Sequence, residues 1–192
     1  MRLEDLNALD EQSATRELRR CCGSSRWTRL MAAARPFRSV GAMALAADAI
    51  WSVLDREDWL EAFAAHPKIG AGGAGESRGA DGSGASGGSS RSDAAGGEGA
   101  EPWSVEEQAG VADAVEATRR RLAEANGEYQ TRFGYIFIVC ATGRTGGEML
   151  EILERRLPND AAGEIQIAAD EQRKITRLRL AKLLEGEQDT IT

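Results

Sequence analysis

The chain has 192 residues, a formal net charge of −7 at pH 7 and a single histidine. This acidic balance argues against nucleic acid as a partner, because binding to phosphates needs a local positive field. No apolar stretch approaches the length of a membrane span, and the amino terminus has no signal-like apolar segment. Three cysteines, Cys21, Cys22 and Cys140, form neither a disulfide framework nor a zinc pattern. We therefore expect a cytoplasmic protein with no membrane partner.

The first third of the chain has the periodicity of helices. Apolar residues spaced three and four apart predict helices over 13–22, 25–34 and 40–54, with the tryptophans in the core. The second helix stops before Arg35-Pro36, because a residue before proline avoids the helical region. A further short helix, capped by Asp58 or a neighbour, must end near His66 because Pro67 follows.

A glycine-rich segment interrupts this pattern over residues 70–100. It holds 12 of the 22 glycines and contains no Val, Ile, Leu, Met, Phe, Trp or Tyr. Such a segment cannot bury enough apolar surface to offset the entropy lost on ordering it. The prediction is one domain over 1–192 that carries a flexible insertion at 70–100.

Helical patterns resume at Ser104 and continue to the end of the chain. In the helix that begins after Ser104, one face carries Gln108, Val111, Val115, Thr118 and Leu122. Asn126-Gly127 is expected to weaken or end this helix before Tyr129. Two more helices are predicted over 146–156 and 161–185, with Pro158-Asn159 breaking the chain and capping the second.

One run, residues 133–141, is strand-like and apolar. It has no convincing partner strand, so we expect a buried extended segment instead of a sheet. The predicted fold class is therefore all-α: a compact multi-helix bundle with one buried extended segment and a long Gly/Ser-rich loop.

Two residues stand out as candidates for chemistry. His66 is the only imidazole and lies at a predicted helix end, so it is either a proton-transfer group or a histidine that interacts with the helix terminus. Arg179 falls on the apolar stripe of the last helix, together with Ile165, Ala168, Gln172, Ile175 and Leu183. A guanidinium on such a face needs an internal carboxylate or an anionic ligand, and both remain possible.

Glu107 has two possible roles. Ser104-x-x-Glu107 is a capping box, in which the two side chains satisfy free backbone donors at a helix start. Alternatively, Glu107 and Gln108 lie at a helix N-terminus that can hold an anionic ligand. Other chemistries find little support, since the chain has no nucleophile elbow, P-loop or metal-ligand pattern. A Cys140–His66 pair would require a proximity that sequence spacing does not reveal.

Six motifs occur together in one order and are quite specific as a set. They are Arg35-Pro36-Phe37, Phe63-Ala64-Ala65-His66-Pro67-Lys68-Ile69-Gly70, Ser104-x-x-Glu107-Gln108, Tyr129-x-x-x-Phe133-Gly134-x-x-Phe137-Ile138-Val139-Cys140-Ala141, Arg156-Leu157-x-Asn159 and Ile175-x-x-Leu178-Arg179-Leu180. On these motifs the chain resembles the 2-oxo-4-hydroxy-4-carboxy-5-ureidoimidazoline (OHCU) decarboxylase family. The resemblance covers nearly everything outside the glycine-rich insertion, which is usually shorter in this family.

The resemblance implies an all-helical, usually homodimeric decarboxylase without a cofactor or metal, which converts OHCU to (S)-allantoin and CO2 in urate degradation. It implies that His66 is the proton donor and that Glu107 and Arg179 are catalytic residues. The residues that it implies for substrate binding are Pro67, Ser104, Val105, Glu106, Glu107, Gln108, Phe137, Ile138, Val139, Cys140 and Ala141.

Two other functions are compatible with the sequence. A non-catalytic dimeric helical interaction module would account for the helices and the insertion, but not for an inward arginine together with a lone histidine. The other is an enzyme that acts on a related ureido acid.

Overall fold

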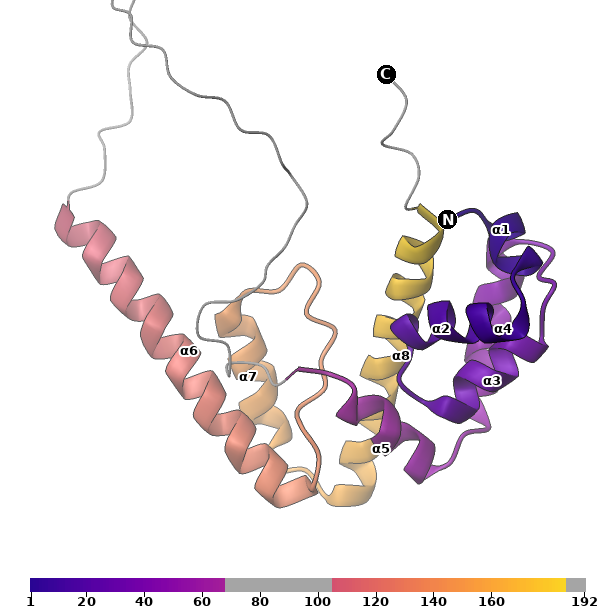
Figure 1. Ribbon diagram of the computed structural model, residues 1–192. Helices are drawn as coiled ribbons and strands as arrows, with labels where there is room; N and C mark the ends of the chain where they lie inside the picture. The colour runs from indigo at the N-terminus through magenta and orange to yellow at the C-terminus, as the bar shows by residue number, and fades with distance from the viewer. Residues whose placement is uncertain (68–104, 186–192) are drawn as a thin grey trace, which may run out of the picture.

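The computed structural model describes residues 1–67 and 105–185, with side chains given over 114–184 in the second range. Ser104 and the predicted flexible insertion 70–100 lie outside the described residues. Within them the chain forms helices and no strand, which confirms the all-α fold class. The helices are α1 (Leu3–Ala8), α2 (Glu11–Cys21), α3 (Ser25–Ala33), α4 (Val40–Ser52), α5 (Arg56–Ala64), α6 (Val105–Phe133), α7 (Gly146–Arg156) and α8 (Ala161–Glu185) (Figure 1).

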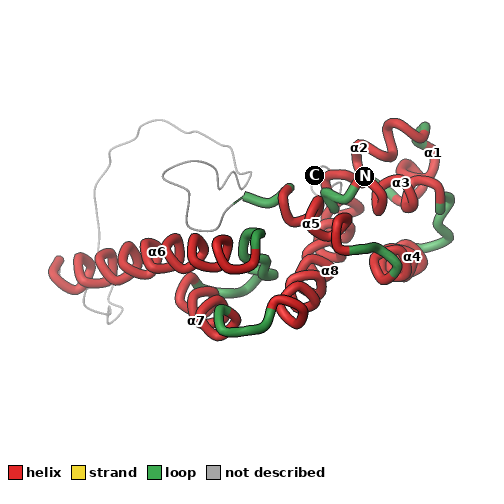
Figure 2. The backbone as a smooth tube through the Cα atoms, turned by 90° about the horizontal axis from the view of Figure 1, so that it is seen from below, coloured by secondary structure: helices red, strands yellow, loops and turns green. Residues whose placement is uncertain are grey.

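Helix α8 lies between two groups of helices. Helices α1–α5 gather on one side of it, and α6 pairs with α7 on the other, so that the first half of α6 projects away from the packed body (Figures 1 and 2). This explains why Val115 is 63% exposed while Leu122, on the same predicted face, is buried. Trp27 and Trp51 are buried in the core, as the sequence predicts.

One helix and two helix caps differ from the prediction. Helix α1 was not predicted, because six residues with one buried side chain, Leu6, are too short to show a period. Helix α5 is capped by Asp55, whose side chain accepts from the N–H of Asp58, while the Asp58 carboxylate accepts from the N–H of Asp55. Helix α8 is capped by Asp160 and not by the predicted Asn159, since the Asp160 carboxylate accepts from the Gly163 N–H at 2.9 Å.

The predicted break at Asn126-Gly127 is wrong, because α6 continues to Phe133. Asn126 is buried, and its Oδ1 accepts a hydrogen bond from the N–H of Phe137 at 3.2 Å. A residue that would weaken an isolated helix is here fixed by a partner outside the helix, and this tertiary contact offsets its low helix propensity.

The extended segment after α6 takes its backbone hydrogen bonds from side chains. Asn126 of α6 accepts from Phe137, Glu171 of α8 accepts from the Cys140 N–H at 2.8 Å, and Arg156 of α7 donates to the Ile138 carbonyl at 2.8 Å. A buried backbone without a neighbouring strand needs such partners, because each unpaired polar group is costly. The predicted buried extended segment is confirmed, and three helices hold it in place.

Arg156 forms a buried ion pair with Glu164 beneath this segment. Their side chains are 8% and 0% exposed, and the shortest N–O distance is 2.6 Å. The hydroxyl of Tyr129 also donates to Glu164, and burial raises the pKa of Tyr129. The guanidinium lies 4.8 Å from the ring centre of Phe137. This cluster connects α6, α7, α8 and the extended segment, and its pairing was not predicted from the sequence.

No helix in the described ranges, 1–67 and 105–185, combines the length and apolar character that crossing a bilayer requires.

Candidate active site

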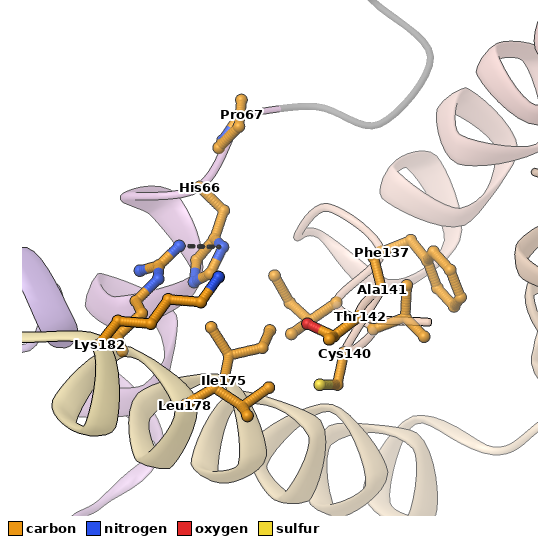
Figure 3. A pocket seen from close by; sticks show the side chains of 12 residues that line it. His66, Pro67, Phe137, Cys140, Ala141, Thr142, Ile175, Leu178 and Lys182 are labelled. Carbon is orange, nitrogen blue, oxygen red and sulfur yellow. Dashed lines mark hydrogen bonds between the residues drawn. The ribbon is translucent and has the colours of Figure 1, made fainter. Parts of the chain in front are cut away.

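A cavity of about 280 Å³ lies where the end of α5, the extended segment and α8 meet (Figure 3). His66 and Pro67 line it from the end of α5, and residues 137–142 line it from the extended segment. Helix α8 contributes Ile175, Leu178, Arg179 and Lys182. The cavity is near the lower limit of small-molecule sites, which suits a compact ligand.

His66 follows the last turn of α5, and this position fixes its direction. The helix ends at Ala64, and the N–H of His66 donates to the Phe63 carbonyl at 3.1 Å. Pro67 has a restricted backbone, so the chain leaves the helix along a defined path. Figure 3 shows the imidazole on the α8 side of the cavity mouth, below Pro67.

Arg179 approaches the imidazole from α8. Its Nη2 lies 3.4 Å from His66 Nδ1, although the two residues are 113 positions apart in the chain. Burial and the charge of Arg179 both lower the pKa of His66 below its ordinary value. Within the described residues no carboxylate forms an ion pair with Arg179. A guanidinium beside a cavity and without such a partner is ready to bind an anionic ligand.

Lys182 was missed by the sequence analysis. It lines the cavity from the turn of α8 that follows Arg179, and Figure 3 shows its amine beside the imidazole. The spacing of three residues after Arg179 could have indicated this position, because residues three apart lie on the same helix face. Two cationic side chains thus border one mostly apolar cavity.

The structure brings together one part of the predicted site, and the other part lies outside the described side chains. His66, Pro67, Arg179 and all of residues 137–141 line the same cavity. Ser104 lies outside the described residues, as do the side chains of Val105, Glu106, Glu107 and Gln108 in the first turn of α6. That turn is at the end of α6 away from α8 (Figure 1). A role of Glu107 at the cavity therefore stays a prediction beside its capping role.

His66 also borders a second cavity of about 330 Å³ on the α6 side, which Gln130 and Tyr135 help to line. None of the described residues that line it is a lysine, arginine or acid. An anionic ligand would therefore favour the first cavity, which has two cationic side chains. In the part of the chain that the structure describes, no group of three His, Cys, Asp or Glu side chains could hold a metal ion.

The titration of His66 gives a direct test of this geometry. Since its pKa lies below 6.5, the unfolded chain binds a proton more readily than the native protein does. His66 should therefore titrate below pH 6.5 in NMR spectra, and the free energy of unfolding should decrease as the pH falls below that value. Arg179→Leu should raise the pKa of His66. An unchanged pKa in this variant would contradict the proximity of the two groups.

Taken together, these observations define a helical protein with a small cavity that two cationic side chains border, where an imidazole and a guanidinium lie side by side. The family model of OHCU decarboxylase matches residues 7–181. The chain therefore belongs to the OHCU decarboxylase family, and this confirms the resemblance seen in its motifs.

Individual relatives agree with this assignment. The chain is 36% identical over 172 residues to the uric acid degradation bifunctional protein TTL of Arabidopsis thaliana, covering 90% of this chain and 48% of that protein. It is 35% identical over 86 residues to the OHCU decarboxylase of Amia calva, covering 45% of this chain and 49% of that protein. The chain thus spans about half of the length of these curated relatives.

Solved structures share the fold. A crystal structure of OHCU decarboxylase in the presence of (S)-allantoin superimposes with a TM-score of 0.63 at 35% identity, covering 88% of this chain and 97% of that chain. A crystal structure of (S)-allantoin synthase superimposes with a TM-score of 0.64 at 16% identity, covering 96% of this chain and 54% of that chain, which indicates the fold alone.

Proposed function

We propose that this protein decarboxylates OHCU to (S)-allantoin and CO2 in urate degradation. The observation that carries the proposal is the approach of Arg179 to His66 on one cavity, at 3.4 Å. The proposed reaction removes CO2 from an anionic substrate and then protonates a carbon atom. An anion-binding group suits the first step, and a proton-transfer group suits the second. Membership of the family and the likeness to a decarboxylase studied with (S)-allantoin support the same reaction.

The reaction can proceed with groups that the cavity offers. The bond from the ring carbon to the carboxylate breaks, CO2 leaves, and the bonding electron pair is delocalised into the adjacent imine. A proton is then delivered to the adjacent ring carbon, which becomes the stereocentre, while the hydroxyl becomes the product carbonyl and its proton moves to the former imine nitrogen. The substrate anion thus takes up one proton overall. A fixed donor on one side of the ring delivers it to one face, which yields one enantiomer.

In this scheme His66 is the catalytic proton donor, and Arg179 with Lys182 binds the anionic part of the substrate. Without ligand, burial and Arg179 keep the imidazole neutral near pH 7. A bound carboxylate neutralises the positive charge of the guanidinium and so raises the pKa of His66. Substrate binding thereby loads the imidazole with the proton that it later transfers. We assign the apolar wall from residues 137–141 to substrate binding and exclusion of water.

Glu107 is proposed as a further catalytic residue and Pro67 as a substrate contact, with Ser104, Val105, Glu106 and Gln108 in a second binding stretch. The resemblance of the motifs supports these roles. A carboxylate near the substrate hydroxyl could hold it while the carbonyl of the product forms. The alternative in which Glu107 only caps α6 is tested by the double variant described in the Discussion.

We further propose that the protein forms a homodimer in the cytoplasm. Helix α4 exposes Leu45 to 71% and Val40 to 49%, and such apolar side chains are candidates for an interface between copies. All three cysteines, Cys21, Cys22 and Cys140, are unpaired, as in proteins of a reducing compartment. The molar mass in solution tests the first proposal.

Arg179→Leu is expected to lower kcat/KM by about 10²-fold while the free energy of unfolding changes by less than about 1 kcal/mol. The side chain is only partly buried and has no described carboxylate partner, so its removal leaves no buried charge unpaired. Turnover and urea unfolding of the same preparation check both parts. Strong destabilisation would instead show that Arg179 stabilises the fold.

The activity itself is tested by generating the substrate from urate in the cuvette and following allantoin by circular dichroism. In free solution a planar intermediate is protonated on both faces, so no enantiomer is enriched. The protein should both accelerate CO2 loss and enrich (S)-allantoin. An interaction module would change neither, and an enzyme for a different ureido acid would turn over that compound but not OHCU.

A further inference from the structure

The approach of Arg179 determines which nitrogen of His66 carries the proton in the neutral ring. A guanidinium has five N–H donors and no acceptor, so His66 Nδ1 must present its lone pair to Nη2 of Arg179 at 3.4 Å. The neutral imidazole therefore carries its hydrogen on Nε2. This nitrogen is buried and has no hydrogen-bond partner among the described residues. The structure thus contains a buried donor that needs an acceptor.

Gln172 of α8 has a buried acceptor that lacks a donor. Its side chain is fully buried, and its Oε1 likewise has no partner among residues 1–67 and 114–184. Gln172 raises the pKa of His66 against the lowering by burial and by Arg179, as a neighbouring group that accepts a hydrogen bond from the protonated ring does. Such an effect requires the amide oxygen as acceptor, because a protonated imidazole only donates.

The other end of the amide is already engaged. Nε2 of Gln172 donates to Oγ1 of Thr176, one turn further along α8, at 3.2 Å. With its nitrogen held by Thr176, the amide has its oxygen left to accept a hydrogen bond from His66. Gln172 is thus a buried polar residue on the apolar stripe of α8, with its amide nitrogen hydrogen-bonded and its amide oxygen without a partner among the described residues.

We propose that Gln172 is a positioning residue for His66: its Oε1 accepts the Nε2 proton and so keeps Nδ1 as the nitrogen that faces Arg179 and the substrate. The catalytic consequence rests on the proposed function. When a substrate anion draws Arg179 away from the imidazole, Nδ1 becomes free to take up a proton and to transfer it. Without Gln172 the Nε2–H tautomer would lose its acceptor, and the buried ring would populate other tautomers or orientations.

The single histidine makes this proposal directly measurable. Protein with isotope-labelled histidine gives the ring-nitrogen signals of His66 alone, and their NMR shifts distinguish the Nε2–H from the Nδ1–H tautomer. Wild type should show the Nε2–H form above its titration midpoint. Gln172→Leu should shift the population toward Nδ1–H and lower kcat by about tenfold or more, with KM changed less than about threefold. Gln166→Leu, on an exposed position of the same helix, is the matched control and should alter neither.

Gln172→Glu provides a second variant of nearly the same shape. It keeps the acceptor and adds a negative charge, so it should retain the Nε2–H tautomer and raise the pKa of His66. An unchanged tautomer population in the leucine variant together with an unchanged pKa of His66 in the glutamate variant would overturn the proposal, as would a wild-type ring in the Nδ1–H form. If the leucine variant does not fold, the glutamate variant is the test: a raised pKa of His66 supports the proposal, and an unchanged pKa contradicts it. Expected NMR shifts in a protein that does not convert OHCU would support the positioning role while the proposed function fails.

Discussion

Replacing His66 by asparagine is expected to lower the rate of stereoselective OHCU decarboxylation by about 10²–10⁴-fold, the range that general acid catalysis supplies. Asparagine fills a similar space but cannot transfer a proton near neutral pH. The chain has no second imidazole to replace it. The check is the initial rate of (S)-allantoin formation by circular dichroism, with thermal unfolding of the same protein to show that the fold is intact. A rate within about threefold of wild type would exclude His66 as proton donor.

The same assay decides the role of Glu107. If Glu107 and His66 act as a unit, Glu107→Gln should cause a comparable loss, and the double variant should be little worse than either single variant. Losses that multiply would mean that the two residues act independently. A Glu107→Gln protein that unfolds early but turns over normally would show that Glu107 only caps α6.

Breaking the buried pair of Arg156 and Glu164 should have the largest effect on stability. Arg156→Met is expected to lower the free energy of unfolding by about 3–5 kcal/mol, because Glu164 is left charged in a site with 0% exposure. The extended segment also loses the donor to its Ile138 carbonyl. Urea unfolding measures this loss. Adding Glu164→Gln to Arg156→Met should recover part of it, since the uncompensated charge is then removed.

Arg20→Met is the matched control for this prediction. Arg20 pairs with Glu17 at 2.8 Å, but its side chain is 73% exposed. Water screens such a pair, so its loss should cost no more than about 1 kcal/mol. If Arg156→Met cost no more than this control, the cluster around Tyr129 would not be a significant source of stability.

The sequence predicted best the features that depend on residues close together in the chain. Helices α7 and α8 begin and end where the periodicity, Gly146 and the proline break indicate. The place of His66 at a helix end follows from the proline after it, and Arg179 lies on the apolar stripe from simple helix geometry. Motif order was sufficient to indicate the family. All these features depend on residues that are neighbours along the chain.

Contacts between distant residues required the tertiary structure. The two arginines show this. Arg156 forms a buried ion pair with the carboxylate of Glu164, whereas Arg179 lies beside His66 at a cavity. Both lie on helices that carry polar and apolar residues, and the sequence alone did not distinguish their partners. Asn126 reads as a helix breaker in sequence, yet it stabilises the extended segment because Phe137 reaches it in space. Sequence spacing specifies which face of an element a side chain occupies. Which groups meet on that face, and hence their charge state and chemistry, depends on how the helices pack, because burial and electrostatic interactions act through space and not along the chain.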